Sequence, residues 1–181
     1  SFISRDFISL DEHIASAAAN LSQPLNPSSE NPIELRAGIY GEYKTRTYKT
    51  RAFEYKWDID ADLPQGFASL PIWAIMVPSN LGVDKIHIND QSEPTDNYKA
   101  NNHLEAVYAA FNIPLGKFNI YTGARLEMFR TAVTSFGNVS NTKRVYDYIN
   151  LLPSLNATYN FNKKSLLRLA YGMTVNRPEF R

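Results

Sequence analysis

The sequence contains no cysteine, and this excludes disulfide bonds and thiolate metal sites. Its histidines, His13, His87 and His103, lie far apart, and none has a metal-ligating neighbour at a useful spacing. The sequence also lacks a Gly-x-Ser-x-Gly nucleophile motif and a glycine-rich phosphate loop. We therefore expect no enzymatic activity and no cofactor.

A long apolar run is also missing. The longest uncharged stretch, 63–83, contains Pro64, Pro71 and Pro78, which would break a membrane-spanning helix. The first residues show no basic region followed by an apolar one, so we expect no signal peptide, and we interpret the chain as a mature protein or a piece of a longer one. The net charge of +1 gives no electrostatic reason to expect nucleic-acid binding.

What the sequence does contain is a repeated hairpin with alternating apolar and polar residues. One copy covers 104–134 with a turn at 114–117, and the other covers 150–176 with a turn at 162–164. Successive side chains of a strand point to opposite faces, so each strand has one apolar and one polar face. The residues predicted to face lipid are Phe111, Ile113, Phe118, Ile120, Leu155, Tyr159 and Phe161.

Two further strands are predicted before these hairpins. The alternation in 33–46 is strong, whereas that in 13–23 is weaker, because its alanines also suit a helix. A turn rich in proline, serine and asparagine joins them at 24–32. The remaining connections are long: 48–102 lacks sustained periodicity, and 136–144 is polar.

These patterns predict an all-β fold of about six antiparallel up-and-down strands. Short turns alternate with long loops, and in outer-membrane barrels the short turns lie on one side of the membrane and the long loops on the other. We interpret 1–181 as part of a large transmembrane outer-membrane β-barrel without a plug domain, with 48–102 as a long extracellular loop. The mean hydropathy of −0.35 is compatible with this fold, because half of the strand residues face a polar lumen.

Charged residues on the polar faces are candidates for contact with a plug domain or a ligand inside the barrel. The other interpretation is a solvated face with cross-strand ion pairs that contribute little. The residues predicted to face the lumen are Arg36, Glu42, Lys44, Arg46, Arg125, Glu127 and Arg168.

The long loop contributes two more candidate sites. Tyr55, Trp57 and Trp73 are candidates for an outer ligand vestibule; the alternative is that 67–83 forms a short strand pair that packs the loop onto itself. Asp58, Asp60 and Asp62 resemble the start of a calcium loop. The glycine and glutamate that an EF-hand requires are missing, so only an irregular calcium site remains possible.

Four stretches, taken in series, resemble the C-terminal barrel of TonB-dependent outer-membrane receptors. They are Ala37-Gly38-Ile39-Tyr40-Gly41-Glu42-Tyr43-Lys44-Thr45-Arg46, Tyr121-Thr122-Gly123-Ala124-Arg125-Leu126-Glu127, Leu152-Pro153-Ser154-Leu155-Asn156-Ala157-Thr158-Tyr159 and Asn176-Arg177-Pro178-Glu179-Phe180-Arg181. The Gly-x-Arg-x-Glu strand, the Leu-Pro-Ser entry and the Arg-Pro-Glu-Phe ending occur in this order in such receptors. The resemblance covers about 33–181.

The resemblance implies a barrel of about 22 strands around a separate plug, which imports a siderophore, cobalamin, a glycan or a peptide. It also implies several partners: outer-membrane lipid, the plug, the remaining barrel strands, the TonB energy-coupling system and a surface lipoprotein. The sequence departs from the family because it contains no plug and no coupling segment, and it has room for only six strands. A soluble antiparallel barrel or sandwich with an internal cavity is the competing interpretation.

Overall fold

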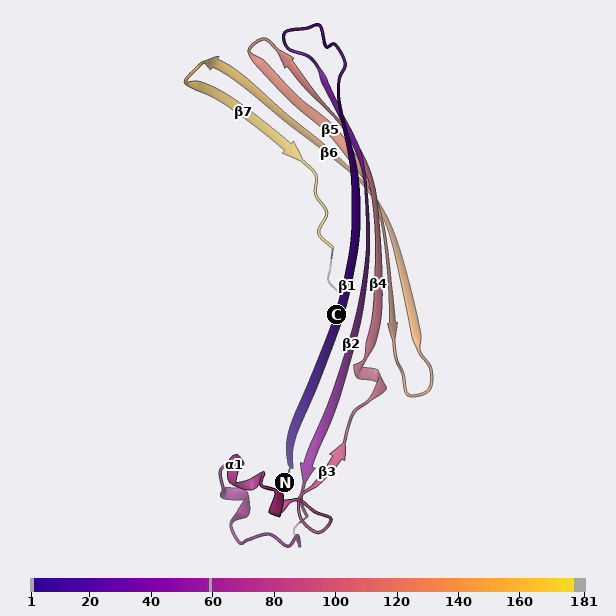
Figure 1. Ribbon diagram of the computed structural model, residues 1–181, viewed down its shortest axis with the longest axis vertical. Helices are drawn as coiled ribbons and strands as arrows, with labels where there is room; N and C mark the ends of the chain where they lie inside the picture. The colour runs from indigo at the N-terminus through magenta and orange to yellow at the C-terminus, as the bar shows by residue number, and fades with distance from the viewer. Residues whose placement is uncertain (1, 59, 178–181) are drawn as a thin grey trace. The chain divides into compact units, whose positions relative to one another are not determined.

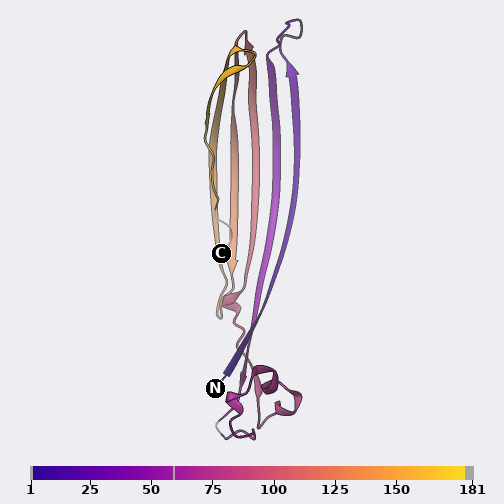
Figure 2. The same ribbon diagram turned by 90° about the vertical axis from the view of Figure 1, so that its left-hand side faces the viewer.

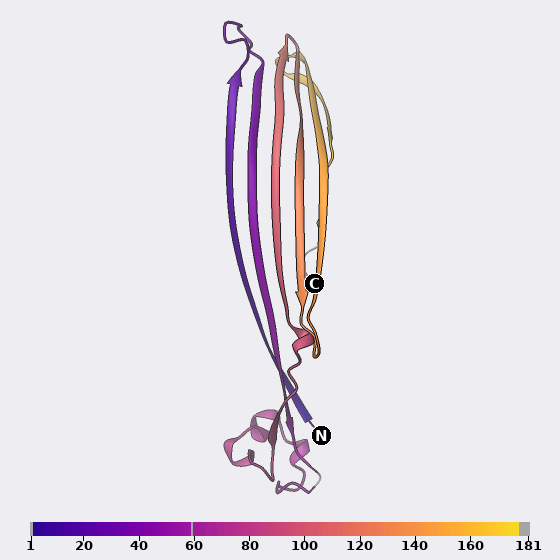
Figure 3. The ribbon, with the colours of Figure 1, turned by 90° about the vertical axis from the view of Figure 1, so that its right-hand side faces the viewer.

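The computed structural model describes residues 2–58 and 60–177 and is an all-β antiparallel sheet (Figure 1). Its strands follow the order β1-β2-β4-β5-β6-β7, and the short strand β3 pairs with β2. Figures 2 and 3 show the long strands side by side in this order. The strands are β1 (Phe2–Pro24), β2 (Glu34–Lys56), β3 (His87–Asp90), β4 (Tyr98–Leu115), β5 (Phe118–Ser135), β6 (Thr142–Asn162) and β7 (Ser165–Gly172).

The chain divides into two compact units, which we describe separately. Unit 1 consists of Ser1–Asp11, Thr47–Lys99 and Thr134–Thr142. Unit 2 consists of Glu12–Arg46, Ala100–Val133 and Lys143–Arg181. Unit 2 contains both predicted hairpin turns, and unit 1 contains most of the predicted long loop.

The first two strands are longer than the sequence predicted. The prediction of a strand at 13–23 is confirmed, and the helical alternative is wrong, because β1 is extended from Phe2 to Pro24. β2 continues beyond 46 to Lys56. Its C-terminal part, Phe53–Lys56, pairs with β3, and this supplies hydrogen-bond partners that the sequence pattern does not reveal.

The two predicted hairpin turns are confirmed, and they close in different ways. β4 and β5 are joined by Gly116 and Lys117, and Gly116 has φ +62°. A positive φ at the first of two turn residues is typical of a type II′ hairpin, where glycine is strongly favoured. The turn between β6 and β7 contains no residue with positive φ; there the Asn162 side chain accepts a hydrogen bond from the Lys164 amide at 2.8 Å.

Three predicted boundaries need correction. The long loop predicted at 48–102 is confined to 57–97, because β2 ends at Lys56 and β4 begins at Tyr98. The polar loop predicted at 136–144 is only 136–141, since β6 begins at Thr142. The last strand, predicted to reach 176, ends at Gly172. Pro178, Glu179, Phe180 and Arg181, which belong to the Arg-Pro-Glu-Phe motif, lie outside the described residues.

The connection 57–97 packs onto itself through helical turns, so the predicted strand pair in 67–83 is wrong. These turns are the 3-10 helices Phe67–Ser69, Pro78–Asn80 and Pro94–Asp96 and the short helix α1 (Ile72–Ile75). Phe67, Ile75 and Ile86 form a buried cluster in unit 1, and Ile86 is 1% exposed. Proline precedes or begins three of these four elements, because its fixed φ suits the first turn of a helix. No helix in 2–58 or 60–177 is long and apolar enough to cross a membrane.

Candidate functional site: the polar face of unit 2

The strands of unit 2 have two faces of opposite character. We call the polar face the one that carries Glu12, Arg36, Lys44, Arg125 and Glu127. These residues form ion pairs within a strand or, in the case of Glu12 and Lys44, between neighbouring strands. The apolar face is the opposite one. Its large exposed side chains include Ile39, Tyr43, Val107, Phe111, Leu115, Phe118, Leu126, Met128, Ile149, Leu151 and Phe161.

Glu12 is the centre of the first charge cluster on the polar face. It is on β1, and Lys44 and Arg46 are on the neighbouring strand β2. The Glu12 carboxylate lies 3.1 Å from the Lys44 ammonium and accepts a hydrogen bond of 2.6 Å from Arg46 Nε. Two of the predicted lumen-facing residues are thus brought together by an acid that the prediction missed. The sequence did contain a signal for Glu12: it lies an even number of residues from Ser16 and Ser22, and therefore on the same face of the strand.

A second polar cluster joins β1, β2 and β4. Arg36 donates to Glu34 at 2.9 Å, and Glu34 also accepts a hydrogen bond from Ser22. On β4, the Tyr108 hydroxyl donates to the Asn20 side chain at 2.9 Å. The predicted residue Arg36 is therefore half of an ion pair on the polar face.

Glu42 pairs with a tyrosine of its own strand. The Tyr40 hydroxyl donates to the Glu42 carboxylate at 2.6 Å. The Arg125 guanidinium lies 5.5 Å from the centre of the Tyr40 ring, in the range of a cation–π contact. Tyr40 therefore links the predicted residues Glu42 and Arg125, and sequence reasoning did not select it.

Among the described residues, Glu127 is the most deeply buried charged residue, with 6% of its surface exposed. Arg125 Nε donates to one of its carboxylate oxygens at 2.6 Å. Arg177, from the segment after β7, donates to the other oxygen. A buried carboxylate needs such partners, because an unpaired buried charge is strongly destabilising.

Small residues allow this polar layer to lie close to the backbone. A Cβ atom at Gly123 would come within 2.6 Å of the Ala109 carbonyl oxygen and the Ala110 side chain. Ala106 and Ala110 are buried at 3% and 5% exposure. Glycine inside a strand marks such close approaches, so Gly123 of the Gly-x-Arg-x-Glu stretch positions Arg125 and Glu127 beside tightly packed backbone.

Arg168 is the one predicted lumen-facing residue that lies apart from these clusters. It is on β7, exposed, and paired in register with Thr158 of β6. Contact of any of these residues with a plug domain stays a prediction.

The apolar face has the dimensions of a membrane-facing band. On β5 it extends from Phe118 to Met128, which corresponds to about 34 Å along a strand. With the usual strand tilt, the height is about 26 Å, close to the apolar band of outer-membrane barrels. Phe118, Tyr159 and Phe161 cluster beside the short turns, with ring centres 4.5 and 4.8 Å apart. Such a cluster is typical of the aromatic girdle at a membrane interface.

The band ends where charged side chains replace apolar ones. Arg130 and Asp147 form an exposed ion pair at 3.5 Å, just beyond Met128 and Ile149. His103 lies beside Tyr43 with ring centres 4.6 Å apart. A cavity of about 510 Å³ lies at this boundary, and all of these residues except Tyr43 line it.

The predicted vestibule residues lie in unit 1 and fall into two groups. Tyr55 and Trp57 pack against the buried cluster, and Trp57 meets Phe67 edge to face with ring centres 5.6 Å apart. Trp57 and Phe67 also line a cavity of about 390 Å³. Trp73 is 76% exposed on α1. Their role in a ligand vestibule stays a prediction.

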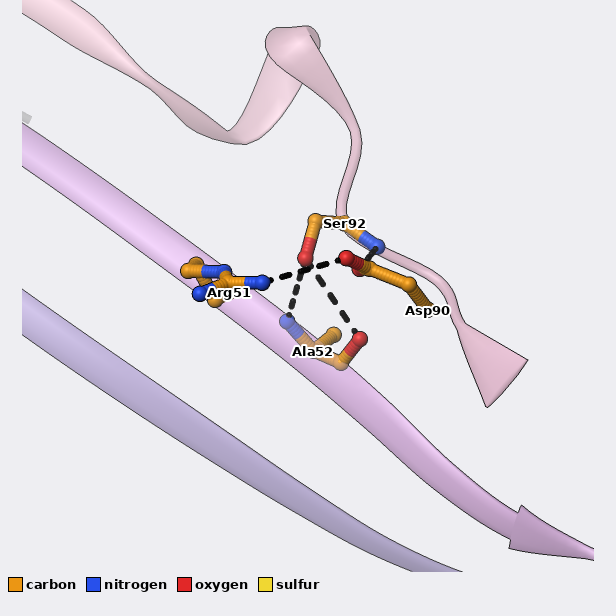
Figure 4. Close-up of polar contacts among 4 residues, drawn as sticks. All are labelled: Arg51, Ala52, Asp90 and Ser92. Carbon is orange, nitrogen blue, oxygen red and sulfur yellow. Dashed lines mark hydrogen bonds and ion pairs between the residues drawn. The ribbon is translucent and has the colours of Figure 1, made fainter. Parts of the chain in front are cut away.

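A side-chain clamp holds the end of the long connection against β2 (Figure 4). The Ala52 amide donates to the Ser92 hydroxyl at 3.1 Å, and the Ser92 amide donates to Asp90 at 2.9 Å. Arg51 lies 3.3 Å from Asp90. The hydrogen bonds from Ser92, and after them Arg51, hold the pKa of the Asp90 carboxyl below its usual value.

The described structure gives no support to the irregular calcium site that the sequence left open at Asp58, Asp60 and Asp62. Within 2–58 and 60–177, no three histidine, cysteine, aspartate or glutamate residues are close enough to hold a metal ion. Asp60 lies in a turn and Asp62 in a bend, and the Ala61 amide donates a hydrogen bond to the Asp58 carbonyl at 3.2 Å.

Comparison with known proteins tests these features at the level of the family. No curated protein matches the chain. Residues 79–181, more than half of the sequence, match the model of an outer membrane protein beta-barrel family. The match covers β3 to β7, including both hairpins and the Glu127 site. It supports an outer-membrane location and decides against the soluble cavity-bearing module. The chain therefore belongs to the outer membrane protein beta-barrel family.

Proposed function

We propose that this chain forms part of the wall of a TonB-dependent outer-membrane receptor that imports a scarce ligand: a siderophore, cobalamin, a glycan or a peptide. The observation that carries the proposal is the charged network on the polar face, directly behind an apolar face of membrane height. In this arrangement the apolar face contacts lipid and the polar face lines the lumen. Three of the four stretches that resemble such receptors contribute to this network: the first supplies Glu42, Lys44 and Arg46, the second Arg125 and Glu127, and the fourth Arg177.

The sheet edges support a larger barrel. In the described residues, β1 and β7 each pair with one neighbouring strand. The hydrocarbon core does not tolerate open sheet edges, because the unpaired N–H and C=O groups there find no water. The remaining strands of a receptor barrel would satisfy both edges, and its plug would contact the polar face.

The long connection 57–97 suits the extracellular side of such a receptor. It has a buried apolar cluster of its own, and Trp57 lines a cavity next to it. Long extracellular loops with their own packing are common in outer-membrane barrels, and binding residues are concentrated on loops. A surface lipoprotein would contact this side, whereas the energy-coupling system acts from the periplasm.

Uptake measurements in the source bacterium test this proposal. We would disrupt the gene and measure accumulation of radiolabelled ferric siderophore, cyanocobalamin, maltoheptaose and a mixed oligopeptide at limiting concentrations. If the chain belongs to such a receptor, we expect accumulation of one probe to fall at least tenfold. Disruption of the energy-coupling protein should cause the same loss.

Two results would contradict the proposal. Unchanged uptake of all four probes would exclude an import role for these ligand classes. A loss that does not depend on the energy-coupling protein would instead indicate a passive pore. In parallel, the native protein should migrate in outer-membrane fractions at several times the 20.5 kDa of this chain.

A further inference from the structure

The segment 173–177, which follows β7, lies against the polar face of unit 2. The Met173 amide still donates a backbone hydrogen bond to the Pro153 carbonyl of β6, at 3.1 Å. Figure 1 shows the chain leaving the line of β7 after this point. Its end is held by Arg177, which pairs with Glu127.

Arg177 also extends an aromatic stack. Its guanidinium lies 4.8 Å from the centre of the Phe129 ring. Phe129 in turn stacks on Tyr148 of β6, with ring centres 6.4 Å apart. The guanidinium thus meets a buried carboxylate and an aromatic face together, and arginine suits such a site better than lysine because its planar group both pairs and stacks.

The sequence of this segment favours a different position. Met173 and Val175 continue the apolar alternation of Leu167, Leu169 and Tyr171, as in a longer β7. If the β6–β7 register continued, Val175 would lie opposite Leu151 and Arg177 opposite Ile149. That register places Arg177 on the apolar face. In the structure it reaches the polar face instead, and it can do so only because the ladder ends at Gly172.

We propose that residues 173–177 form a strap with two seats. In the docked seat, which the structure shows, Arg177 occupies a guanidinium site made by Glu127 and Phe129 on the polar face. In the released seat, the strap extends β7 along β6, and Glu127 loses one of its two partners. The length of β7 and access to this part of the polar face are therefore coupled. If the polar face lines a lumen, as proposed above, release of the strap opens that part of the lumen.

Cysteine cross-linking in the native protein distinguishes the two seats, and residues 1–181 contain no cysteine that would compete with the introduced pairs. The pair Leu151→Cys with Val175→Cys reports the released seat. The pair Ala157→Cys with Leu169→Cys is the matched control, because these residues are register partners in the existing ladder. Both pairs are tested in outer membranes with a mild oxidant.

The reporter pair is then combined with variants of the site. Glu127→Gln and Arg177→Gln each remove the ion pair, and Glu105→Gln removes an exposed carboxylate of β4. We expect little cross-linking of the reporter pair in the wild-type background, at least a fivefold increase with either Gln variant at the site, and no change with Glu105→Gln. Because Glu127 is buried, Arg177→Gln serves as the second route if Glu127→Gln does not assemble.

Two outcomes overturn the proposal. Complete cross-linking of the reporter pair in every background would mean that β7 is always extended. Little cross-linking in every background, while the control pair reacts fully, would mean that the segment does not exchange. Heat-modifiable migration on gels confirms that each compared variant is folded.

Discussion

Unit 1 and unit 2 place their apolar side chains in opposite ways. Unit 1 buries Phe67, Ile75 and Ile86 in a cluster shielded from solvent. Unit 2 exposes large apolar side chains such as Phe111 and Leu126, while its buried residues are Ala100, Ala106, Ala110 and Glu127. The reason is the surrounding solvent: in water apolar groups must be covered, whereas in lipid an apolar face is already in a favourable environment. The comparison shows that burial alone does not identify the important residues in this protein.

The largest expected effect follows from removing the centre of the unit 1 cluster. Ile86→Ala should destabilise unit 1 by about 2–5 kcal/mol, because it leaves a cavity in a fully buried position. Hydrogen exchange should accelerate in 63–97 and remain unchanged in the hairpin of β4 and β5. Ile88→Ala, at a position 58% exposed, is the control and should have little effect. Similar acceleration of hydrogen exchange in both regions would contradict the division of the chain into two units.

The second prediction concerns the apolar face of unit 2. Phe111→Arg places a charge near the middle of the apolar face, and such a charge costs about 2–4 kcal/mol in a membrane barrel. We expect loss of the heat-modifiable outer-membrane form. Asn112→Arg, one residue further and on the opposite face, should assemble. Normal assembly of Phe111→Arg would contradict a lipid-facing position.

A smaller effect concerns the polar face. Gly123→Ala introduces a Cβ within 2.6 Å of backbone and side-chain atoms of β4, and such overpacking costs about 1–3 kcal/mol. Gly41→Ala meets nothing within 4 Å and is the control. The midpoint of unfolding in urea should fall for the first variant only. Equal midpoints would show that the strands can separate slightly at no cost.

The smallest effect is the pH dependence of the clamp in unit 1. Hydrogen bonds from Ser92, and then Arg51, lower the pKa of Asp90 in the folded protein. A lowered pKa stabilises the fold at pH above the ordinary aspartate value of about 3.9, and this contribution disappears as pH falls through the lowered pKa. Exchange in 91–97, corrected for intrinsic rates, should therefore rise below about pH 4. Asp90→Asn should remove this dependence, and an unchanged profile in that variant would assign it to another group.

The alternation of side chains allowed much of the fold to be predicted. The hairpins, their turns and the strand at β2 follow from a period of two, which few other structures produce over such lengths. Arg125 and Glu127 were selected for the polar face because they alternate with Leu126. The structure brings together Arg36, Glu42, Lys44, Arg46, Arg125 and Glu127 with their neighbours, and their predicted contact with a plug remains to be tested.

The residues that prediction missed are those that depend on distant partners. Glu12 and Tyr40 became part of the charge network only when β1, β2 and β5 were aligned. Ser92 and Asn97 replace strand partners of β2 with their side chains: Asn97 accepts a hydrogen bond of 2.8 Å from the Thr50 amide. A loop that pairs through side chains has no periodic signature, and for this reason β2 was predicted ten residues too short.

The sequence by itself determined which residues share a face, because that follows from the geometry of a single strand and the need to separate apolar from polar side chains. Only the tertiary structure decided which strands are neighbours, and so which charges pair. It also decided where β7 ends: the local pattern continues to Val175, but the chain leaves the ladder after Gly172. The physical reason is that these pairings join residues far apart in the sequence: Arg177 contacts the buried carboxylate of Glu127, which lies fifty residues earlier in the chain.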